Sequence, residues 1–331
     1  MPSADPTGPA PVGLRYDELQ RRGPEGAWRP LAGIPLLLVI FFAGQLVMSV
    51  VVTLVLVAGG DSSTAAVDKL SGDIATPSFL ALVNLGWAAA IPAVWVVARL
   101  LHGQTPGWVT SVAGALRWRW FAVCLGLAVV ALALTVLASG MLPDQGSSTL
   151  DTSGGANPWT STVRDFLLVI VLLTPLQAAG EEYVFRGYLA QAFGGLAARA
   201  GARVSAAVAV VVPALLFALA HGLGQDVPIF LDRFAFGLVA GLLVILTGGL
   251  EAGIAMHVLN NFLAFGLALA FSDMTEALNP TGGSWWSIPV TLVQSVGYLL
   301  LAVGAARRLG VQDRTRGPEG GVILEAEQAD G

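Results

Sequence analysis

The chain has 331 residues, of which 55% are apolar and only 12% are charged, and its mean hydropathy is +0.73. Soluble domains carry roughly 25% charged residues, so one soluble core does not explain this composition. The net charge of −5 and the lack of a basic block exclude a nucleic-acid partner. The single cysteine, Cys124, excludes an intrachain disulfide and a thiolate metal cluster, and is expected to be a small apolar residue. We predict an all-α polytopic membrane protein whose partner is the lipid bilayer.

Residues 1–30, at the start of the chain, are rich in proline, glycine and charged residues. They are predicted to form a disordered cytoplasmic tail. Eight apolar runs follow, at 31–58, 77–101, 119–142, 164–192, 204–222, 228–249, 251–272 and 287–306. Each is near the ~20 residues that a helix needs to cross the hydrocarbon layer, so we expect about eight transmembrane helices. The first run starts too late and is too long for a signal peptide. Residues 307–331 are charged and glycine-rich, and are predicted to form a second disordered tail.

Basic residues set the predicted orientation of these spans. Arginines gather in both tails and in alternate connections, whereas the opposite connections hold only Lys69, Arg164 and Arg233. Positive charge favours the cytoplasmic side, so both termini are expected in the cytoplasm, in the plasma membrane of a bacterium. His102, beside Gly103 at a cytoplasmic helix end, is expected to be solvated.

Ionisable groups inside the predicted spans are candidates for function, because each costs a few kcal/mol in hydrocarbon. The fourth run contains Glu181, Glu182 and Arg186. Glu182 and Arg186 are four residues apart, so they lie on one helix face and can pair. Glu181 is rotated by about 100° from Glu182 and has no partner on its own helix, which suits a general base. A purely structural role, as polar contacts between helices, stays open.

Two later spans add histidines to this set. Phe217 and His221 are four residues apart on one predicted helix face, and so are His257 and Asn261. Histidine and asparagine offer the donors that a developing oxyanion requires. A carboxylate base, two imidazoles and an amide inside a membrane indicate hydrolysis of an amide bond. No histidine is followed by glutamate, which excludes an HExxH zinc site, but zinc held by Glu181, His221 and His257 stays possible.

Three motifs in this order resemble those of the CPBP family, which comprises CAAX prenyl endopeptidases and bacteriocin-processing relatives also called Abi proteins. The motifs are Glu181-Glu182-x-x-x-Arg186, Phe217-x-x-x-His221 and His257-x-x-x-Asn261. The resemblance implies an intramembrane endopeptidase with its active site among the later helices. The implied catalytic core is 164–272, after three helices and their loops in 31–163 and before a last loop and helix in 273–306.

The resemblance also implies a role for each motif residue. Glu181 and His221 would activate water, and His257 and Asn261 would stabilise the oxyanion. Glu182, Arg186 and Phe217 would support the site. This mechanism needs no metal, so no cofactor is favoured, although zinc stays possible. The implied substrate is a peptide or protein, which can be lipidated.

The predicted helix ends conflict with a single site in one respect. They place His221 on the order of 15 Å from the depth of Glu181. A tilted helix, a re-entrant element after Arg203 or a different boundary near Pro213 would close this offset. Two other functions stay open, namely a non-catalytic scaffold or peptide-binding immunity protein, and a proton-coupled transporter. The lack of an internal repeat argues against the transporter.

Overall fold

The computed structural model describes residues 12–139, 155–221, 224, 226–278 and 283–316. Eight spans within these residues are long and apolar enough to cross a membrane. In chain order they are α1 (Trp28–Ala58), α3 with α4 (Pro77–Ala88 and Ala90–His102), α6 (Trp118–Ser139), α7 with η2 and α8 (Ser161–Glu182, Tyr183–Leu189 and Ala190–Ala197), α9 (Ala202–Ala220), α10 (Val227–Thr247), α11 (Glu251–Phe271) and α13 (Ser287–Arg308). The predicted all-α polytopic fold is confirmed.

Short elements lie between these spans and at their ends. They are η1 (Tyr16–Arg22), α2 (Ser63–Leu70), α5 (Pro106–Thr110), η3 (Ala198–Ala200) and α12 (Met274–Leu278). Among the described residues, extended backbone pairs only at an isolated bridge between Ser111 and Gly249. This bridge attaches the segment after α5 to the turn between α10 and α11.

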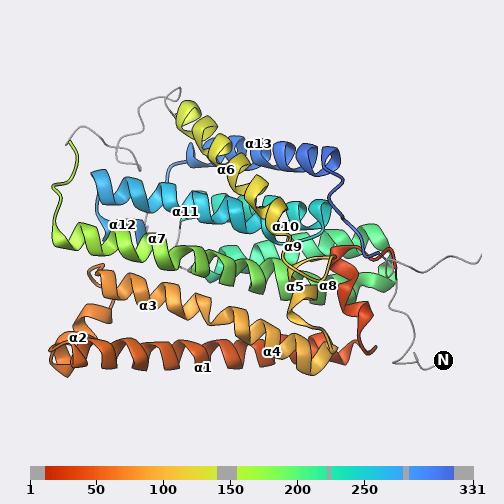
Figure 1. The fold of residues 1–331 in the computed structure, drawn as a ribbon, viewed down its shortest axis with the longest axis horizontal. Coiled ribbons are helices and arrows are strands. Elements are labelled where there is room, and N and C mark those ends of the chain that lie inside the picture. The colour runs from red at the N-terminus through yellow and green to blue at the C-terminus, as the bar shows by residue number, and fades with distance from the viewer. Residues whose placement is uncertain (1–11, 140–154, 222–223, 225, 279–282, 317–331) are drawn as a thin grey trace, which may run out of the picture.

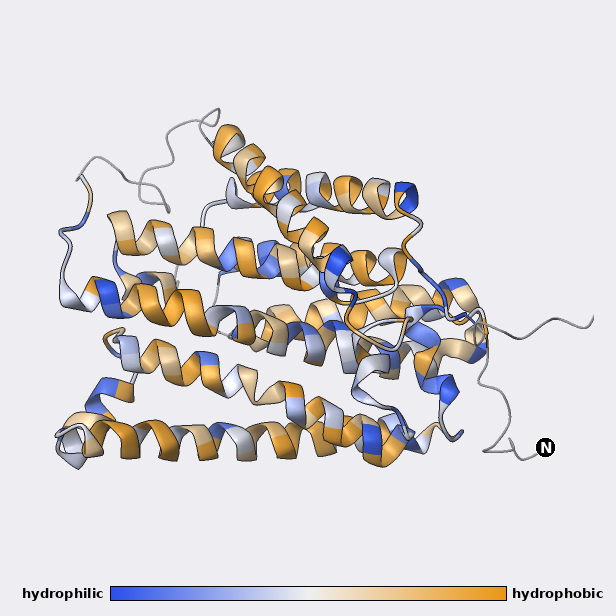
Figure 2. Cartoon of the chain, in the orientation of Figure 1, coloured by the Kyte–Doolittle hydropathy of each residue, from blue (hydrophilic) through white to orange (hydrophobic). Residues whose placement is uncertain are grey.

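The outer surface of the bundle is apolar along most of its length. Leu38, Phe42 and Leu46 of α1 are 52%, 64% and 67% exposed. Figure 2 shows this hydrophobic surface along the helices, with hydrophilic residues concentrated towards the ends of the bundle. So large an apolar surface is stable against hydrocarbon rather than water, which makes the lipid bilayer the surroundings of this protein.

The long helices run roughly side by side in three tiers (Figure 1). In this view α1, α3 and α4 form the lower tier, and α6 and α13 form the upper tier. The middle tier contains α7, α8, α9, α10 and α11, in which α7 contacts both α3 and α11, and α9 contacts α10. This tier holds every motif residue identified in the sequence.

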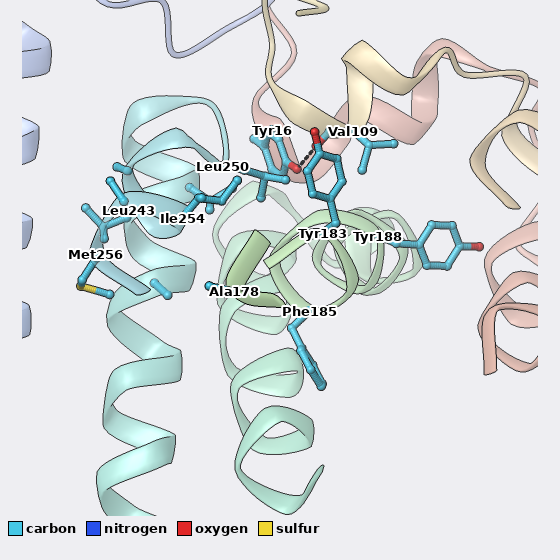
Figure 3. Close-up of a cluster of buried hydrophobic side chains, with 14 of the residues drawn as sticks. Tyr16, Val109, Ala178, Tyr183, Phe185, Tyr188, Leu243, Leu250, Ile254 and Met256 are labelled. Carbon is cyan, nitrogen blue, oxygen red and sulfur yellow. Dashed lines mark hydrogen bonds between the residues drawn. The ribbon is translucent and has the colours of Figure 1, made fainter. Parts of the chain in front are cut away.

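A π-helical turn, η2, interrupts the fourth span just after Glu182. Tyr183, Phe185 and Tyr188 project from it in different directions into the core (Figure 3), and all three are buried. The hydroxyl of Tyr183 lies 2.7 Å from that of Thr110. π-Helical turns occur frequently at functional sites. Arg186, the charged residue of this turn, is 1% exposed.

The segments near the two chain ends pack against each other. The amide of Gly13 donates to the carbonyl of Thr315 at 2.9 Å, and the amide of Thr315 donates to the carbonyl of Leu14 at 2.9 Å. Tyr16 is fully buried, and its hydroxyl donates to the carbonyl of Val109 (Figure 3). Burial raises the pKa of Tyr16 well above its ordinary value, so the hydroxyl remains a neutral donor.

These contacts correct the predicted tails, because residues 12–30 and 307–316 are folded onto the bundle. Tyr16 and Leu19 are each 0% exposed. Two isolated buried side chains in a polar segment form no hydrophobic pattern, so the sequence did not indicate that this segment is folded. The rest of both predicted tails, and the predicted run ends at 142 and 222, lie outside the described residues.

His102 also differs from its prediction, since it is buried rather than solvated. It is 2% exposed, and its Nε2 lies 3.0 Å from the hydroxyl of Tyr188. The N-terminal segment covers this end of α4, where Gln104 donates to the carbonyl of Leu19 at 2.7 Å. Cys124 is fully buried, as expected of a small apolar residue.

Candidate functional site

Two glycines allow α7 to lie close to its neighbours at the level of the motif residues. A Cβ on Gly180 would overlap the backbone carbonyl of Trp87 in α3, and a Cβ on Gly253 of α11 would lie 2.8 Å from Oε2 of Glu182. Real Cβ atoms do not approach that closely. Gly180 therefore permits the close packing of α7 against α3, and Gly253 permits the close packing of α11 against Glu182 of α7.

Glu182 is the centre of a buried cluster of charged and polar groups. Its Oε1 lies 3.0 Å from Nη1 of Arg186 and 3.0 Å from Nδ1 of His257. The side chains of Arg186 and Glu182 are 1% and 0% exposed. The predicted pairing of Glu182 with Arg186 is confirmed, and His257 is a second partner. A carboxylate paired with Arg186 accepts hydrogen bonds, so Nδ1 of His257 is the donor.

Aromatic rings cover the guanidinium of Arg186. It lies 4.1 Å from the ring centroid of Phe217 and 5.8 Å from that of Phe236. Cations are attracted to the faces of aromatic rings, and more strongly where water is excluded. Phe217 of the second motif is therefore in contact with the charged cluster of the first.

Glu181 lies beside the opposite edge of the His257 ring. Its Oε2 is 3.6 Å from Nε2 of His257, and its side chain is 4% exposed. Its Oε1 accepts a hydrogen bond from Nε2 of Gln177, one turn earlier on the same helix. The prediction that Glu181 has no partner on its own helix is therefore wrong.

Asn261 is linked to the same carboxylate through Gln177. Nδ2 of Asn261 donates to Oε1 of Gln177 at 3.0 Å, and Gln177 donates in turn to Glu181. The amide nitrogen of Asn261 has a second hydrogen that this contact does not use. Sequence reasoning missed Gln177 because the search was for ionisable groups. Its position four residues before Glu181 was the available signal.

His221 lies at the end of α9 and is turned back towards its own helix. Its Nδ1 is 2.8 Å from the carbonyl oxygen of Phe217. A carbonyl can only accept, so Nδ1 carries the proton and Nε2 is the accepting nitrogen of the neutral ring. The ring centroid of Phe217 lies 4.4 Å from that of His221 and 6.0 Å from that of His257.

These ring distances show that the predicted depth offset of about 15 Å for His221 is wrong. The prediction started every helix at the membrane edge. In Figure 1, α9 begins near α8 and the N-terminal segment, and ends near the middle of the bundle, short of the edge that α1 and α7 reach. His221 therefore lies near the level of the other motif residues, without a re-entrant element.

A small polar cavity of about 40 Å³ lies beside His257 and Asn261. The other residues that line it come from α9, α10, α11 and α13, namely Phe217, Asp232, Arg233, Phe236, Asn260 and Thr291. A polar cavity of this size can hold a water molecule. The structure thus provides a place for water next to two of the predicted catalytic residues.

Asp232 and Arg233 are cavity residues that sequence reasoning did not identify. Arg233 was assigned to a connection and Asp232 was overlooked, although both lie within the predicted run 228–249. Oδ1 of Asp232 and Nε of Arg233 are buried without a protein hydrogen-bond partner in the described part of the chain. Two adjacent charges inside an apolar run were the signal for a polar cavity.

The zinc alternative does not fit this arrangement. Within the described residues, no three histidine, cysteine, aspartate or glutamate side chains are placed to hold a metal ion. We therefore derive no chemical step through a metal from Glu181, His221 and His257.

A comparison with protein families bears on the region that contains all three motifs. Residues 163–263, roughly a third of the chain, match the family model "Type II CAAX prenyl endopeptidase Rce1-like". This segment is similar to the Rce1-like endopeptidases. The match confirms the resemblance to the CPBP family. No curated protein and no solved structure matches the chain.

The Rce1-like segment, residues 163–263, includes every predicted catalytic and supporting residue, and Gln177, Asp232 and Arg233 as well. At the level of the family, the match supports a CAAX-type intramembrane protease. The first three spans and α13 lie outside it.

Proposed function

We propose that this protein is an intramembrane endopeptidase that hydrolyses a peptide bond with water activated by Glu181 and His221. Two observations support the proposal most directly: Glu181 contacts His257, and His257 and Asn261 line a water-sized polar cavity. The Rce1-like match supports an endopeptidase independently of the geometry.

The proposed reaction uses Glu181 as the general base. Glu181 accepts a proton from water as the water oxygen forms a bond to the carbonyl carbon of the substrate. The tetrahedral intermediate then collapses, the carbon–nitrogen bond breaks, and Glu181 returns the proton to the leaving amine nitrogen. The hydrogen bond from Gln177 fixes one carboxylate oxygen, so Oε2 is the oxygen that we assign to proton transfer.

His221 is proposed to orient the attacking water from the other side. Because Nδ1 donates to the carbonyl of Phe217, Nε2 is the nitrogen that can accept a hydrogen bond from water. The ring packs against Phe217, which fixes its orientation. This arrangement supplies a second acceptor, so the lone pair of the water can point at the substrate carbonyl.

Asn261 and His257 are proposed to stabilise the oxyanion. The second amide hydrogen of Asn261 and Nε2 of His257 are the donors beside the cavity. With Nδ1 donating to Glu182, Nε2 can donate only when the His257 ring carries both protons.

The substrate is proposed to be a peptide or protein that reaches the site from within or beside the bilayer. The family match favours a lipid-modified substrate. The distribution of arginines favours cytoplasmic termini in a bacterial plasma membrane.

A direct test uses the purified protein in lipid nanodiscs with a mixture of peptides derived from a proteome. We expect internal cleavage of a subset of peptides, detected as new termini by mass spectrometry. If no peptide is cleaved, and if the protein instead binds peptides with measurable affinity, the endopeptidase proposal is wrong and a binding role replaces it.

Metal removal is a second test, because the donor geometry does not fit zinc. We expect cleavage after dialysis against EDTA to stay within about twofold of the untreated protein. Loss of cleavage that zinc restores would contradict the proposed mechanism.

Gln177 is predicted to be a positioning residue for Glu181. Gln177→Ala removes one hydrogen bond to a carboxylate, worth about 1.5–3 kcal/mol, so we expect kcat to fall roughly 10- to 100-fold. KM is expected to change little, because Gln177 does not line the cavity. Gln177→Glu, which keeps the size but cannot donate when ionised, should not restore kcat. A change confined to KM would contradict this role.

A further inference from the structure

A second cavity lies away from the proposed active site. It has a volume of about 650 Å³ and lies between the first turn of α6 and the end of α13. In Figure 1 these two helices cross and then diverge towards the end of the bundle where the N-terminal segment lies. We call this cavity the α6–α13 cleft; Arg117, Trp118, Arg119, Trp120, Leu309 and Val311 line it. All of them lie outside the Rce1-like segment.

Positive charge is concentrated at the mouth of the cleft. Arg119 lines it, and Arg307 and Arg308 come directly before Leu309 of its wall. All three arginines are exposed, and none has a hydrogen-bond or ion-pair partner within the described residues. Asp313 is the one exposed acid in the adjoining described segment 309–316, so the surface keeps an excess of positive charge.

The same cleft presents large apolar groups beside these charges. Trp118 is 71% exposed and Leu309 is 60% exposed. Tryptophan at a helix end is typical of the membrane–water interface, where one side of the ring meets hydrocarbon. An apolar wedge between two diverging helices, with unpaired arginines at its rim, is complementary to a molecule with acyl chains and an anionic headgroup.

We propose that the α6–α13 cleft binds an anionic phospholipid. The headgroup phosphate contacts Arg119 and Arg308, and the acyl chains lie along the apolar walls of α6 and α13. This proposal does not depend on the proposed endopeptidase function.

A lipid in this cleft would lie next to the ion pair that fixes the start of α11. Nε and Nη2 of Arg117 donate to the two carboxylate oxygens of Glu251 at 2.8 and 2.7 Å. Glu251 is the first residue of α11, the helix that presents His257 and Asn261 to the site. Occupancy of the cleft is therefore expected to stabilise the protein as well as to bind lipid.

The test measures lipid binding to the full chain in detergent by native mass spectrometry. Phosphatidylglycerol and phosphatidylcholine with identical acyl chains are the probes. We expect phosphatidylglycerol to bind preferentially and to raise the melting temperature. Arg119→Gln with Arg308→Gln should weaken its binding roughly 30-fold, from the usual contribution of juxtamembrane arginines.

The matched control is Arg199→Gln with Arg203→Gln, two exposed arginines in η3 and in the first turn of α9, close to the N-terminal segment. It removes the same charge and should leave binding unchanged. Equal loss in both double variants, or equal binding of the two lipids, would overturn the proposal. Displacement of the lipid by glycerol phosphate at millimolar concentration would also overturn it, because a soluble phosphate ligand needs no apolar wedge.

Discussion

Glu181→Gln is expected to lower kcat for any cleaved peptide by roughly 100- to 10,000-fold, the range for loss of a general acid–base group. Glutamine is nearly isosteric with glutamate, but its amide is too weak a base to accept a proton from water. The change removes a negative charge whose ionic contact is at 3.6 Å to His257, and the amide oxygen of glutamine can still accept the hydrogen bond from Gln177. We therefore expect the melting temperature to stay near that of the wild type. Steady-state kinetics and thermal unfolding of the purified variant provide the measurement.

Asp165→Asn is the matched control for this variant. Asp165 is an acidic residue on the same helix, with a 45% exposed side chain paired to Arg164 at the surface. We expect its kcat to be within about twofold of the wild type. If Glu181→Gln kept kcat within tenfold of the control, Glu181 could not be the base.

Arg186→Met is expected to have the largest effect on stability. It leaves the carboxylate of Glu182 buried without its cation, and breaking a buried ion pair from one side costs about 3–5 kcal/mol. Methionine fills much of the space beside Phe217, so the cost comes mainly from the uncompensated charge. Thermal unfolding in detergent should show a large decrease in melting temperature, together with loss of activity.

The double variant Glu182→Gln with Arg186→Met separates charge from volume. Removing both charges is expected to recover much of the lost stability, because no isolated charge remains. It should not recover activity, because Nδ1 of His257 then lacks its carboxylate partner. If the double variant melted no higher than Arg186→Met alone, electrostatics would not be the reason for the instability.

The membrane fold and the motif pairs could be predicted because they depend on local sequence. Span length follows from hydrophobic runs, and helical periodicity places Glu182 beside Arg186 within one helix. Helical periodicity could not show that His257, from α11, donates to the same oxygen of Glu182 that Arg186 contacts. That contact depends on the packing of α7 against α11, which no spacing rule provides.

The missed site residues share a physical reason. Gln177 is uncharged, and its role appears only when its partners are known on both sides, Glu181 and Asn261. Arg233 was placed in a connection between helices, although it lies with Asp232 inside an apolar run, where both residues line the cavity. A search for polar residues of every kind at four-residue spacing within spans would have found Gln177.

Depth and burial were the least predictable properties. The error for His221 arose because the length of a helix gives its extent but not where in the bilayer it begins. The error for His102 arose because a helix end can be covered by another part of the chain, here by the segment containing Leu19. Both depend on tertiary contacts between residues distant in sequence.

The most direct measurement compares peptide termini across the membrane proteome of cells that express the wild type or Glu181→Gln at equal levels. We predict a set of new termini that depends on the wild type, and these termini would identify both the substrate and its cleavage site. Identical sets of termini, with both proteins inserted and folded, would contradict the proposed endopeptidase activity.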